Sequence, residues 1–395
     1  MKTVCLLGSS SGRNAGDAAL IGAIMRDLDE VVQEPLRYEV PTTNPKYLKK
    51  YYSEHDARAV PIMPWNASIR VLGWTTYRAI QRADIVLIFD AILFDRSLLN
   101  PLFNFMSPLF LMLPRARKRG IKMGMYNVGV GPVSTDLGKH MLRTLVDQMD
   151  FITVRDEGSI DVLREAGAYR DDVILAADAA VNAPYTNAED TSRRLADQGI
   201  EANSDFIAIN VNPYIDSWAG ATAAGLDKKS FLDTYAASLR VVWDKIRVPY
   251  LFVCTQHMDV DITSELQDRL EPEMYIGRFS NRFCGHQDIK GVLGRAGLTV
   301  GMRLHSIILA ASMNVPVVGL AYQPKVEFFL KSNGLEDYCL HFKDFSVDTF
   351  SSLVLNAWQN RNETRSHLER RVPELQSAAR IPAGLVQQLM ESTDS

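Results

Sequence analysis

The segment 298–322, LTVGMRLHSIILAASMNVPVVGLAY, places an arginine and a histidine where an apolar strand pattern changes to a helical one. Residues 298–302 predict a buried strand, and the apolar run after Arg303, Leu304 and His305 predicts a helix. The free amides of a helix N-terminus favour an anion. Arginine binds carboxylate or phosphate as a fork, and histidine can donate a proton near neutral pH. We interpret Arg303 and His305 as an anion-binding and proton-donating pair; the alternative is a core histidine that only packs.

Two further cations follow predicted buried strands. Arg155 ends the run FITVR (151–155), which places it at the edge of a sheet where ligands bind. The alternative is a surface turn in which Arg155 pairs with Asp156. Lys325 follows the strand pattern 315–322 and could add a cation to the same site, or could be an ordinary solvated lysine.

A glycine-rich loop follows the first predicted strand, in the segment GSSSGRNAGDAAL (8–20). Its glycines allow a tight turn and close approach of the backbone to a ligand. Gly16, Asn14 and Asp17 are therefore candidate contacts for sugar hydroxyls, and Asp17 is also a candidate cap of the next helix. The glycine spacing does not fit a dinucleotide fingerprint, and no Walker sequence follows. The alternative is a plain strand–loop–helix turn.

Near-continuous Val, Ile and Leu runs separated by helical patterns indicate parallel sheets covered on both faces. A polar segment at 182–205 separates two such series. The sequence therefore predicts an α/β fold with two Rossmann-like domains, residues 1–190 and 200–360, facing a central cleft, and a helical tail over 361–395. The predicted strands are 3–8, 38–42, 57–63, 84–90, 122–131, 151–156, 172–180, 206–214, 250–256, 274–279, 298–302 and 315–322.

The composition sets the class of the chain. Lys and Arg total 43 against 47 Asp and Glu, so the formal net charge is −4 and gives no general nucleic-acid footprint. The four cysteines have no metal-ligand or CxxC spacing, and we expect reduced, packed thiols in a cytoplasmic protein. The sequence contains neither a signal-peptide pattern nor a stretch of about 20 apolar residues.

No metal site is expected from the sequence. Cys284 and His286 are only two potential ligands, and the nearest acidic run contains Asp259 and Asp261. We interpret Asp259 as an exposed helix cap, although His257 and Asp259 could also line the cleft.

The apolar segment 98–120 ends in the four cations Arg115, Arg117, Lys118 and Arg119. A buried helix with cations at its C-terminus explains this pattern, because the helix dipole favours positive charge there. The alternative is peripheral docking on a membrane near a lipid-linked acceptor. We favour the buried helix on the sequence alone.

Four blocks together resemble the polysaccharide pyruvyl transferase family: GRNAGDAAL (12–20), NVGVGP (127–132), VRDEGSIDVLREAG (154–167) and GMRLHSIILAASMNVPVVGLAYQPKV (301–326). The resemblance implies a GT-B-like fold and transfer of the pyruvyl group of phosphoenolpyruvate to sugar hydroxyls, with release of phosphate. The acceptor would be a polysaccharide, glycoside or lipid-linked saccharide, and no cofactor beyond the co-substrate is implied.

The resemblance also implies site residues. It assigns donor binding to Arg303, Leu304 and His305, with Arg155 and Lys325 as further donor contacts. We expect His305 to act as the general acid.

One block departs from the family pattern. Members usually carry a glycine-rich turn where this sequence has IFDAILFD (88–95), so Asp90 would lie on the acceptor side. Two other functions therefore stay open: a GT-B glycosyltransferase that uses a nucleotide sugar, and a diverged, non-catalytic binding protein on the same fold.

Overall fold

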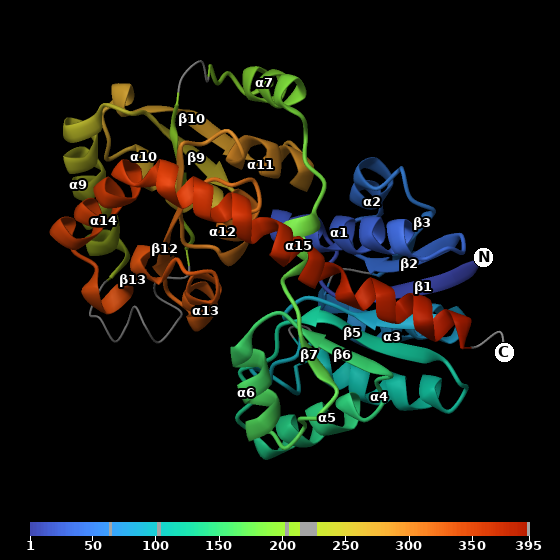
Figure 1. The fold of residues 1–395 in the computed structure, drawn as a ribbon. Helices are drawn as coiled ribbons and strands as arrows, with labels where there is room; N and C mark the ends of the chain where they lie inside the picture. Colours follow the sequence, from blue (N-terminus) through green and yellow to red (C-terminus); the bar gives the residue numbers. More distant parts are fainter. Residues whose placement is uncertain (63–64, 101–103, 202–204, 214–226, 393–395) are drawn as a thin grey trace. The chain divides into compact units, whose positions relative to one another are not determined.

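Buried apolar strands alternate with helices through almost the whole chain (Figure 1). The computed structural model describes residues 1–62, 65–100, 104–201, 205–213 and 227–392, with residues 65–72 described by their backbone alone. The chain forms two compact units. The first unit consists of Met1–Gly12, Asp17–Ala183 and Leu375–Ser395, and the second of Arg13–Gly16 and Pro184–Glu374.

This division differs from the predicted one at two places. The main crossing falls at residues 183–184, inside the polar segment 182–205. However, Arg13–Gly16 groups with the second unit, and the end of the C-terminal helix from Leu375 onward groups with the first. Both exchanges lie in or beside helices, α1 (Ala15–Val31) and α15 (Arg361–Glu391), so no change of sequence pattern marks them.

The described part of the first unit contains a seven-stranded sheet in the order β3-β2-β1-β4-β5-β6-β7. All of its strand pairs are parallel. The strands are β1 Lys2–Leu7, β2 Leu36–Thr42, β3 Ala57–Pro61, β4 Ile85–Ile88, β5 Lys122–Val128, β6 Phe151–Val154 and β7 Val173–Leu175.

Helices cover both faces of this sheet. Apolar side chains of α3, α4, α5 and α6 form one core cluster with the strands. α1 and the last part of α15 belong to the other face: Asn127 at the end of β5 donates a hydrogen bond of 2.8 Å to the carbonyl of Ala379. The helices are α1 Ala15–Val31, α2 Pro45–Tyr51, α3 Trp65–Arg82, α4 Met106–Arg117, α5 Asp136–Val146, α6 Glu157–Glu165 and α15 Arg361–Glu391.

The second unit repeats the same construction. Its described residues form a six-stranded parallel sheet in the order β10-β9-β8-β11-β12-β13. The strands are β8 Ile207–Asn210, β9 Tyr250–Cys254, β10 Tyr275–Ser280, β11 Leu298–Gly301, β12 Val317–Ala321 and β13 Cys339–His341. The helices are α7 Ala188–Asp197, α9 Lys228–Ile246, α10 Asp259–Gln267, α11 His286–Leu293, α12 Leu304–Ala311, α13 Pro324–Ser332 and α14 Val347–Gln359.

Each sheet has the Rossmann order, in which the direction of strand succession reverses once. The reversal lies between β1 and β4 in the first unit and between β8 and β11 in the second. The carboxyl ends of these strand pairs are therefore the expected ligand positions. The prediction of two Rossmann-like α/β domains is confirmed.

All twelve predicted strands are present, whereas β13, with three residues at a sheet edge, was not predicted. No helix among the described residues is both long and apolar enough to cross a membrane.

Candidate functional site

Arg303 lies at the switch point of the second sheet. Strand β11 ends at Gly301, and Arg303 is the N-cap residue of α12, with an extended backbone. Its backbone N–H donates to Oδ1 of Asn210, the last residue of β8, over 3.1 Å. Asn210 in turn donates from Nδ2 to the carbonyl of Val253 on β9, over 2.9 Å. A buried asparagine thus joins three neighbouring strand ends and fixes the start of α12.

The guanidinium of Arg303 is held by a buried carboxylate. Its Nε lies 2.9 and 2.8 Å from the two carboxylate oxygens of Asp259, and its Nη2 also donates to Oδ1. The side chains of Arg303 and Asp259 are only 9% and 0% exposed. Burial raises the pKa of Asp259, while the charge of Arg303 and the amide of Gln256 act to lower it. The pair is a charge-assisted fork that fixes the plane of the guanidinium.

The prediction that Asp259 is an exposed helix cap is wrong. Asp259 is the first residue of α10, directly beyond the carboxyl end of β9. β9 pairs with β8, so this end of β9 lies close to the switch point rather than in solvent. The sequence analysis did not predict that Asp259 binds Arg303; its position after a buried strand was the available signal.

His305 packs against the glycine-rich loop. It is the second residue of α12, and its Nε2 atom is buried. A Cβ placed on Gly16 would lie 2.2 Å from both Cγ and Nδ1 of the His305 ring, so only glycine fits there. Oδ1 of Asn14 accepts the Gly16 amide over 2.9 Å. The residues 13–16 thus lie with the Arg303–His305 segment inside one unit.

The other predicted contacts are distributed between the two units. Leu304 is buried at the start of α12, and Lys325 lies in the first turn of α13, directly after β12. Asp17 lies in the first turn of α1 but belongs to the first unit. Asn14, rather than Asp17, caps the start of α1 through its side chain. Leu304, Lys325 and Asn14 share the second unit with Arg303.

Arg155 lies in the first unit, directly after β6, and its side chain is only 5% exposed, so it is not part of a solvent-exposed turn. Its Nη1 donates to Oδ2 of Asp178 over 2.8 Å, and Nε lies 3.6 Å from Oδ2 of Asp156. Burial acts to lower the pKa of Arg155, but Asp178, Asp156 and Asp90 outweigh it and raise that pKa. A Cβ on Gly129 would lie 2.8 Å from Nη2 of Arg155, so the bare backbone of β5's end makes room for the guanidinium.

Asp90 takes the place of the expected glycine turn. It is buried after β4 with φ 70°, a left-handed conformation that favours glycine. Its Oδ1 accepts the following amide, of Ala91, over 2.6 Å, which is a local bond that aspartate can make in this conformation. The backbone at Asp90 therefore keeps the left-handed conformation that a glycine would adopt there. The carboxylate of Asp90 occupies the space that a glycine, without a side chain, would leave open.

Two partners of the predicted residues were not predicted at all. Asp178 holds Arg155, and Asn210 holds the backbone of Arg303. A residue such as Asp178 has no recognisable spacing to Arg155, because the contact depends on where the chain returns after β7. Asn210 had a usable signal: it is a polar residue directly after the apolar run 206–209.

Metal ligation finds no support within the described residues, where no three His, Cys, Asp or Glu side chains gather in a way that could hold an ion. His286 is fully buried at the start of α11, and burial together with Lys290 lowers its pKa to about 3. His286 is therefore a neutral core residue at ordinary pH.

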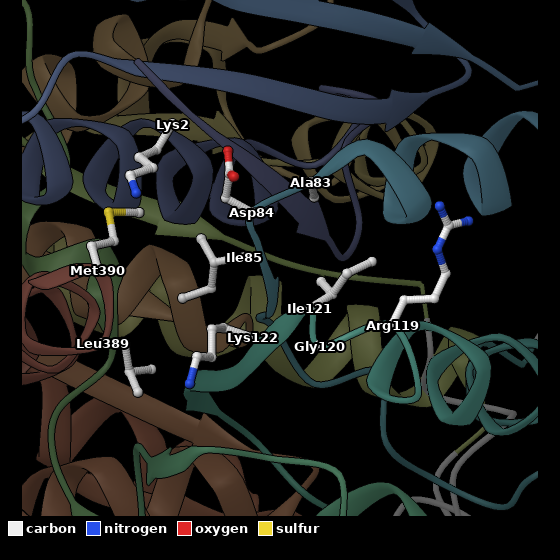
Figure 2. A pocket seen from close by; sticks show the side chains of 10 residues that line it. All are labelled: Lys2, Ala83, Asp84, Ile85, Arg119, Gly120, Ile121, Lys122, Leu389 and Met390. Carbon is white, nitrogen blue, oxygen red and sulfur yellow. The ribbon is translucent and has the colours of Figure 1, made fainter. Parts of the chain in front are cut away.

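A separate pocket of about 200 Å³ lies in the first unit (Figure 2). It is lined by Lys2, Ile85 and Lys122, which begin β1, β4 and β5, and by the end of α15. These residues lie at the amino ends of the strands, whereas Arg155 and Asp90 follow the carboxyl ends of β6 and β4. The pocket and these two residues therefore lie at opposite ends of the strands. The pocket is not part of the predicted site.

The fold is similar to those of nucleotide-sugar enzymes of known structure. UDP-GlcNAc 2-epimerase from Neisseria meningitidis, solved bound to UDP-GlcNAc, is 13% identical with a TM-score of 0.62, covering 99% of this chain and 100% of that one. E. coli ADP-heptose LPS heptosyltransferase II is 12% identical with a TM-score of 0.53, covering 91% and 99%. Anabaena Alr3699/HepE, solved with UDP-glucose, is 12% identical with a TM-score of 0.59, covering 100% of both chains. These likenesses define a two-domain α/β protein of the GT-B-like fold.

The family follows from the sequence profile. The profile described as polysaccharide pyruvyl transferase matches residues 14–324, about four-fifths of the chain. The chain therefore belongs to the polysaccharide pyruvyl transferase family, as the four sequence blocks predicted. A comparison with curated proteins gives no significant match.

Proposed function

We propose that this protein transfers the pyruvyl group of phosphoenolpyruvate to two hydroxyls of a saccharide, forming a cyclic ketal and releasing phosphate. Membership of the polysaccharide pyruvyl transferase family supports the reaction class. The observation that carries the assignment to residues is the placement of Arg303 and His305 at the switch point of the second sheet, at the N-terminus of α12.

The donor carries a carboxylate and a phosphate, and the N-terminus of α12 offers partial positive charge to such an anion. Arg303 supplies directed N–H donors whose plane Asp259 fixes. Asp259 is a positioning residue in this scheme, because it acts through Arg303. Leu304 and Lys325 would complete the donor side of the second unit, and Arg155 is the predicted donor contact from the first.

The chemistry needs one proton on carbon and one on the leaving phosphate. Protonation of the methylene carbon turns C2 of phosphoenolpyruvate into an oxocarbenium-like centre, which one sugar hydroxyl attacks. The second hydroxyl then displaces phosphate from C2, and the two hydroxyl protons balance the new methyl group and the released phosphate. His305 is the proposed general acid, a role that typically contributes about 10²–10⁴-fold in rate. The loop residues Asn14, Gly16 and Asp17, with Asp90, are the proposed acceptor contacts.

The direct test is phosphate release from phosphoenolpyruvate across a panel of glycosides and lipid-linked sugars. The wild-type protein should release phosphate only when a suitable acceptor is present, and His305→Ala should lower kcat by about 100-fold or more. The matched control is His140→Ala, since His140 is exposed on α5 and belongs to the first unit, whereas His305 belongs to the second. Full turnover by His305→Ala would remove the general-acid assignment.

The role of Arg303 needs a paired design. Arg303→Ala alone leaves the carboxylate of Asp259 buried without its partner, which is expected to weaken the fold. The double variant Arg303→Ala/Asp259→Ala removes both charges. Both variants should lose donor affinity, but the double variant should recover much of the stability. Unchanged donor affinity in a folded double variant would contradict the proposed role of Arg303.

A nucleotide-sugar transferase is the second candidate, because structural relatives with this fold were solved with UDP-GlcNAc and UDP-glucose. Thermal unfolding with each ligand separates the two functions. Stabilisation by phosphoenolpyruvate supports pyruvyl transfer, and stabilisation by UDP-sugars alone favours glycosyl transfer. Stabilisation by neither, together with no phosphate release, would favour a binding protein that has lost the reaction.

A further inference from the structure

Two segments of the first unit are strongly basic although the chain as a whole has a net charge of −4. Residues 65–82 and 96–122 contain nine Lys and Arg and no Asp or Glu. These segments include helices α3 and α4. A one-signed charge run on a mildly acidic protein points to an anionic partner.

Helix α4 has one buried and one exposed face. Its inward residues Met106, Leu109, Leu113 and Ala116 belong to the core of the first unit. On the outward face, Leu111 is 59% exposed, and Arg115 and Lys118 follow it at helical spacing. The buried helix predicted for 98–120 therefore accounts for only one side of α4.

Helix α3 repeats this arrangement next to α4. Trp74 is 64% exposed, and Arg78 follows one turn later on the same side. The two helices are neighbours: a Cβ on Gly73 would lie 3.3 Å from Cε of Met112. At their other ends, Arg119 beyond α4 donates to Oε1 of Gln81 on α3 over 2.9 Å. Each helix thus shows solvent a large apolar side chain followed by cations.

We call this region the α3–α4 surface and define it by Trp74, Arg78, Leu111, Arg115, Lys118 and Arg119. Two other cations of the same segments form ion pairs, since Arg82 binds Glu39 and Arg117 binds Asp150. In the part of the chain that the structure describes, no carboxylate lies within ion-pair distance of the four cations of the α3–α4 surface. Arg115 and Arg119 donate only to uncharged groups, the carbonyl of Leu111 and Oε1 of Gln81, so no carboxylate neutralises their positive charge.

The pocket of Figure 2 continues this positive charge. Arg119 belongs to both features, and Lys122 and Lys2 line the same pocket. Its single lining carboxylate, Asp84, already accepts the backbone N–H of Thr3 over 2.7 Å. Apolar side chains of Ile121 and the end of α15 form the remaining walls that Figure 2 shows. The pocket is thus suited to the phosphate group of a headgroup beside the surface.

We propose that the α3–α4 surface docks this protein on a bilayer that contains anionic phospholipid. A tryptophan and a leucine on neighbouring helices supply the apolar contact that enters the headgroup region, where tryptophan is favoured. The four cations attract acidic headgroups, and each Lys or Arg close to the membrane adds its own contribution to this attraction. Charge complementarity and the exposed apolar side chains together favour a bilayer over a nucleic acid. The proposal stands apart from pyruvyl transfer, since binding is measured without any substrate.

The test is co-sedimentation of the full-length protein with vesicles of phosphatidylcholine alone or with 30% phosphatidylglycerol. The surface variant carries Arg78→Glu, Arg115→Glu, Lys118→Glu and Arg119→Glu. The matched control carries the same four charge reversals at exposed cations elsewhere in the first unit: Lys49, Lys50, Arg58 and Arg164. A second surface variant with glutamine at the four positions replaces the first if the glutamate variant does not fold. Circular dichroism and thermal unfolding establish that each protein is folded.

We expect wild-type protein to bind only the phosphatidylglycerol vesicles and to be released by 0.5 M NaCl, because salt screens exposed charges. The surface variant should bind about 100-fold more weakly or worse, and the control should lose far less. The pair Trp74→Ala/Leu111→Ala should also weaken binding, with its charges unchanged. Absence of wild-type binding, equal losses in surface and control variants, or full retention by the surface variant would each overturn the proposal. Equally tight binding to duplex DNA, with no effect of the Trp74 and Leu111 changes, would indicate a general polyanion surface instead.

Discussion

Gly16→Ala tests whether the glycine-rich loop sets the position of His305. The added Cβ would lie 2.2 Å from Cγ and Nδ1 of His305 and 2.4 Å from its Cβ. Ordinary contacts are 3.4 Å or longer, so the imidazole must move by more than 1 Å. Gly16 has no positive φ, so alanine suits its backbone and the overlap is the whole perturbation. A misplacement of about 1 Å in a reacting group can lower turnover by about 10²-fold, and overpacking typically costs about 1–3 kcal/mol of stability.

The assay is acceptor-dependent phosphate release, with urea unfolding measured in parallel. Gly384→Ala is the matched control: it lies in helix α15, and a Cβ there meets nothing within 4 Å. The control should keep full turnover and gain about 0.5–1 kcal/mol, because alanine is favoured over glycine inside a helix. Gly16→Ala should lose about 100-fold in kcat while remaining folded.

Combining Gly16→Ala with His305→Ala separates a local effect from a general one. If Gly16 acts through the imidazole, the loss caused by Gly16→Ala should largely disappear once the ring is absent. Turnover of Gly16→Ala within threefold of wild type would refute the reasoning, as would full additivity of the two losses. An NMR spectrum of the imidazole resonances provides a readout that does not depend on the reaction: the His305 signals should shift in Gly16→Ala and not in Gly384→Ala.

Three further changes test buried groups. Asp259→Asn removes the negative charge that holds Arg303, and urea unfolding should show a loss of about 3–5 kcal/mol; an unchanged midpoint would contradict the buried ion pair. At Asp90, with φ 70°, alanine should be less stable than glycine by about 1–2 kcal/mol, and the reverse order would show that the backbone is not left-handed there. His286 has a folded pKa of about 3, below its ordinary value, so the unfolded chain binds a proton between pH 6.5 and 3 that the fold does not. The free energy of unfolding should therefore decrease as the pH is lowered through this range, by up to about 1.4 kcal/mol per pH unit from this group. His286→Gln should flatten the slope of unfolding free energy against pH, measured from pH 7 to 5. Two parallel curves for the variant and the wild type would contradict this.

Those features that depend on local pattern could be predicted from the sequence. Strands buried on both faces produce apolar runs that need no context, so β1 to β12 were all found. β13 has three residues and, in the sheet that the described residues form, pairs with β12 alone, so it carries too little pattern to be recognised. The position of Arg303 before a helix followed from the same local change of period.

Partners that depend on the return of the chain could not be predicted. Asp178 is 23 residues from Arg155 and Asp259 is 44 residues from Arg303, yet each carboxylate sits against its arginine. Asp178 lies beyond the carboxyl end of β7, the neighbour of β6, and Asp259 lies beyond that of β9, two strands away from β11. The order and register of each sheet therefore decide which of these side chains meet. The sequence allowed a surface turn for Arg155 and an exposed cap for Asp259 because periodicity carries no information about these distances.

The two arginines that looked like free anion forks are therefore compensated within their own units. A guanidinium held by a buried carboxylate adds little net positive charge, but it is held in one orientation and loses little freedom when it binds. Anion recognition at Arg303 would then depend on the direction of its donors and on the amides at the start of α12 more than on bulk charge. Among the described residues of the first unit, four cations that no carboxylate neutralises lie instead on or directly after α3 and α4: Arg78, Arg115, Lys118 and Arg119, the last of which also lines the pocket at the amino ends of the strands. Different residues thus carry the two roles: the cations of the α3–α4 surface supply charge for a large anionic surface, and Arg303 with the amides of α12 supplies donors for a small anion. Substitution of the surface cations should leave pyruvyl transfer intact, and substitution of Arg303 should leave vesicle binding intact.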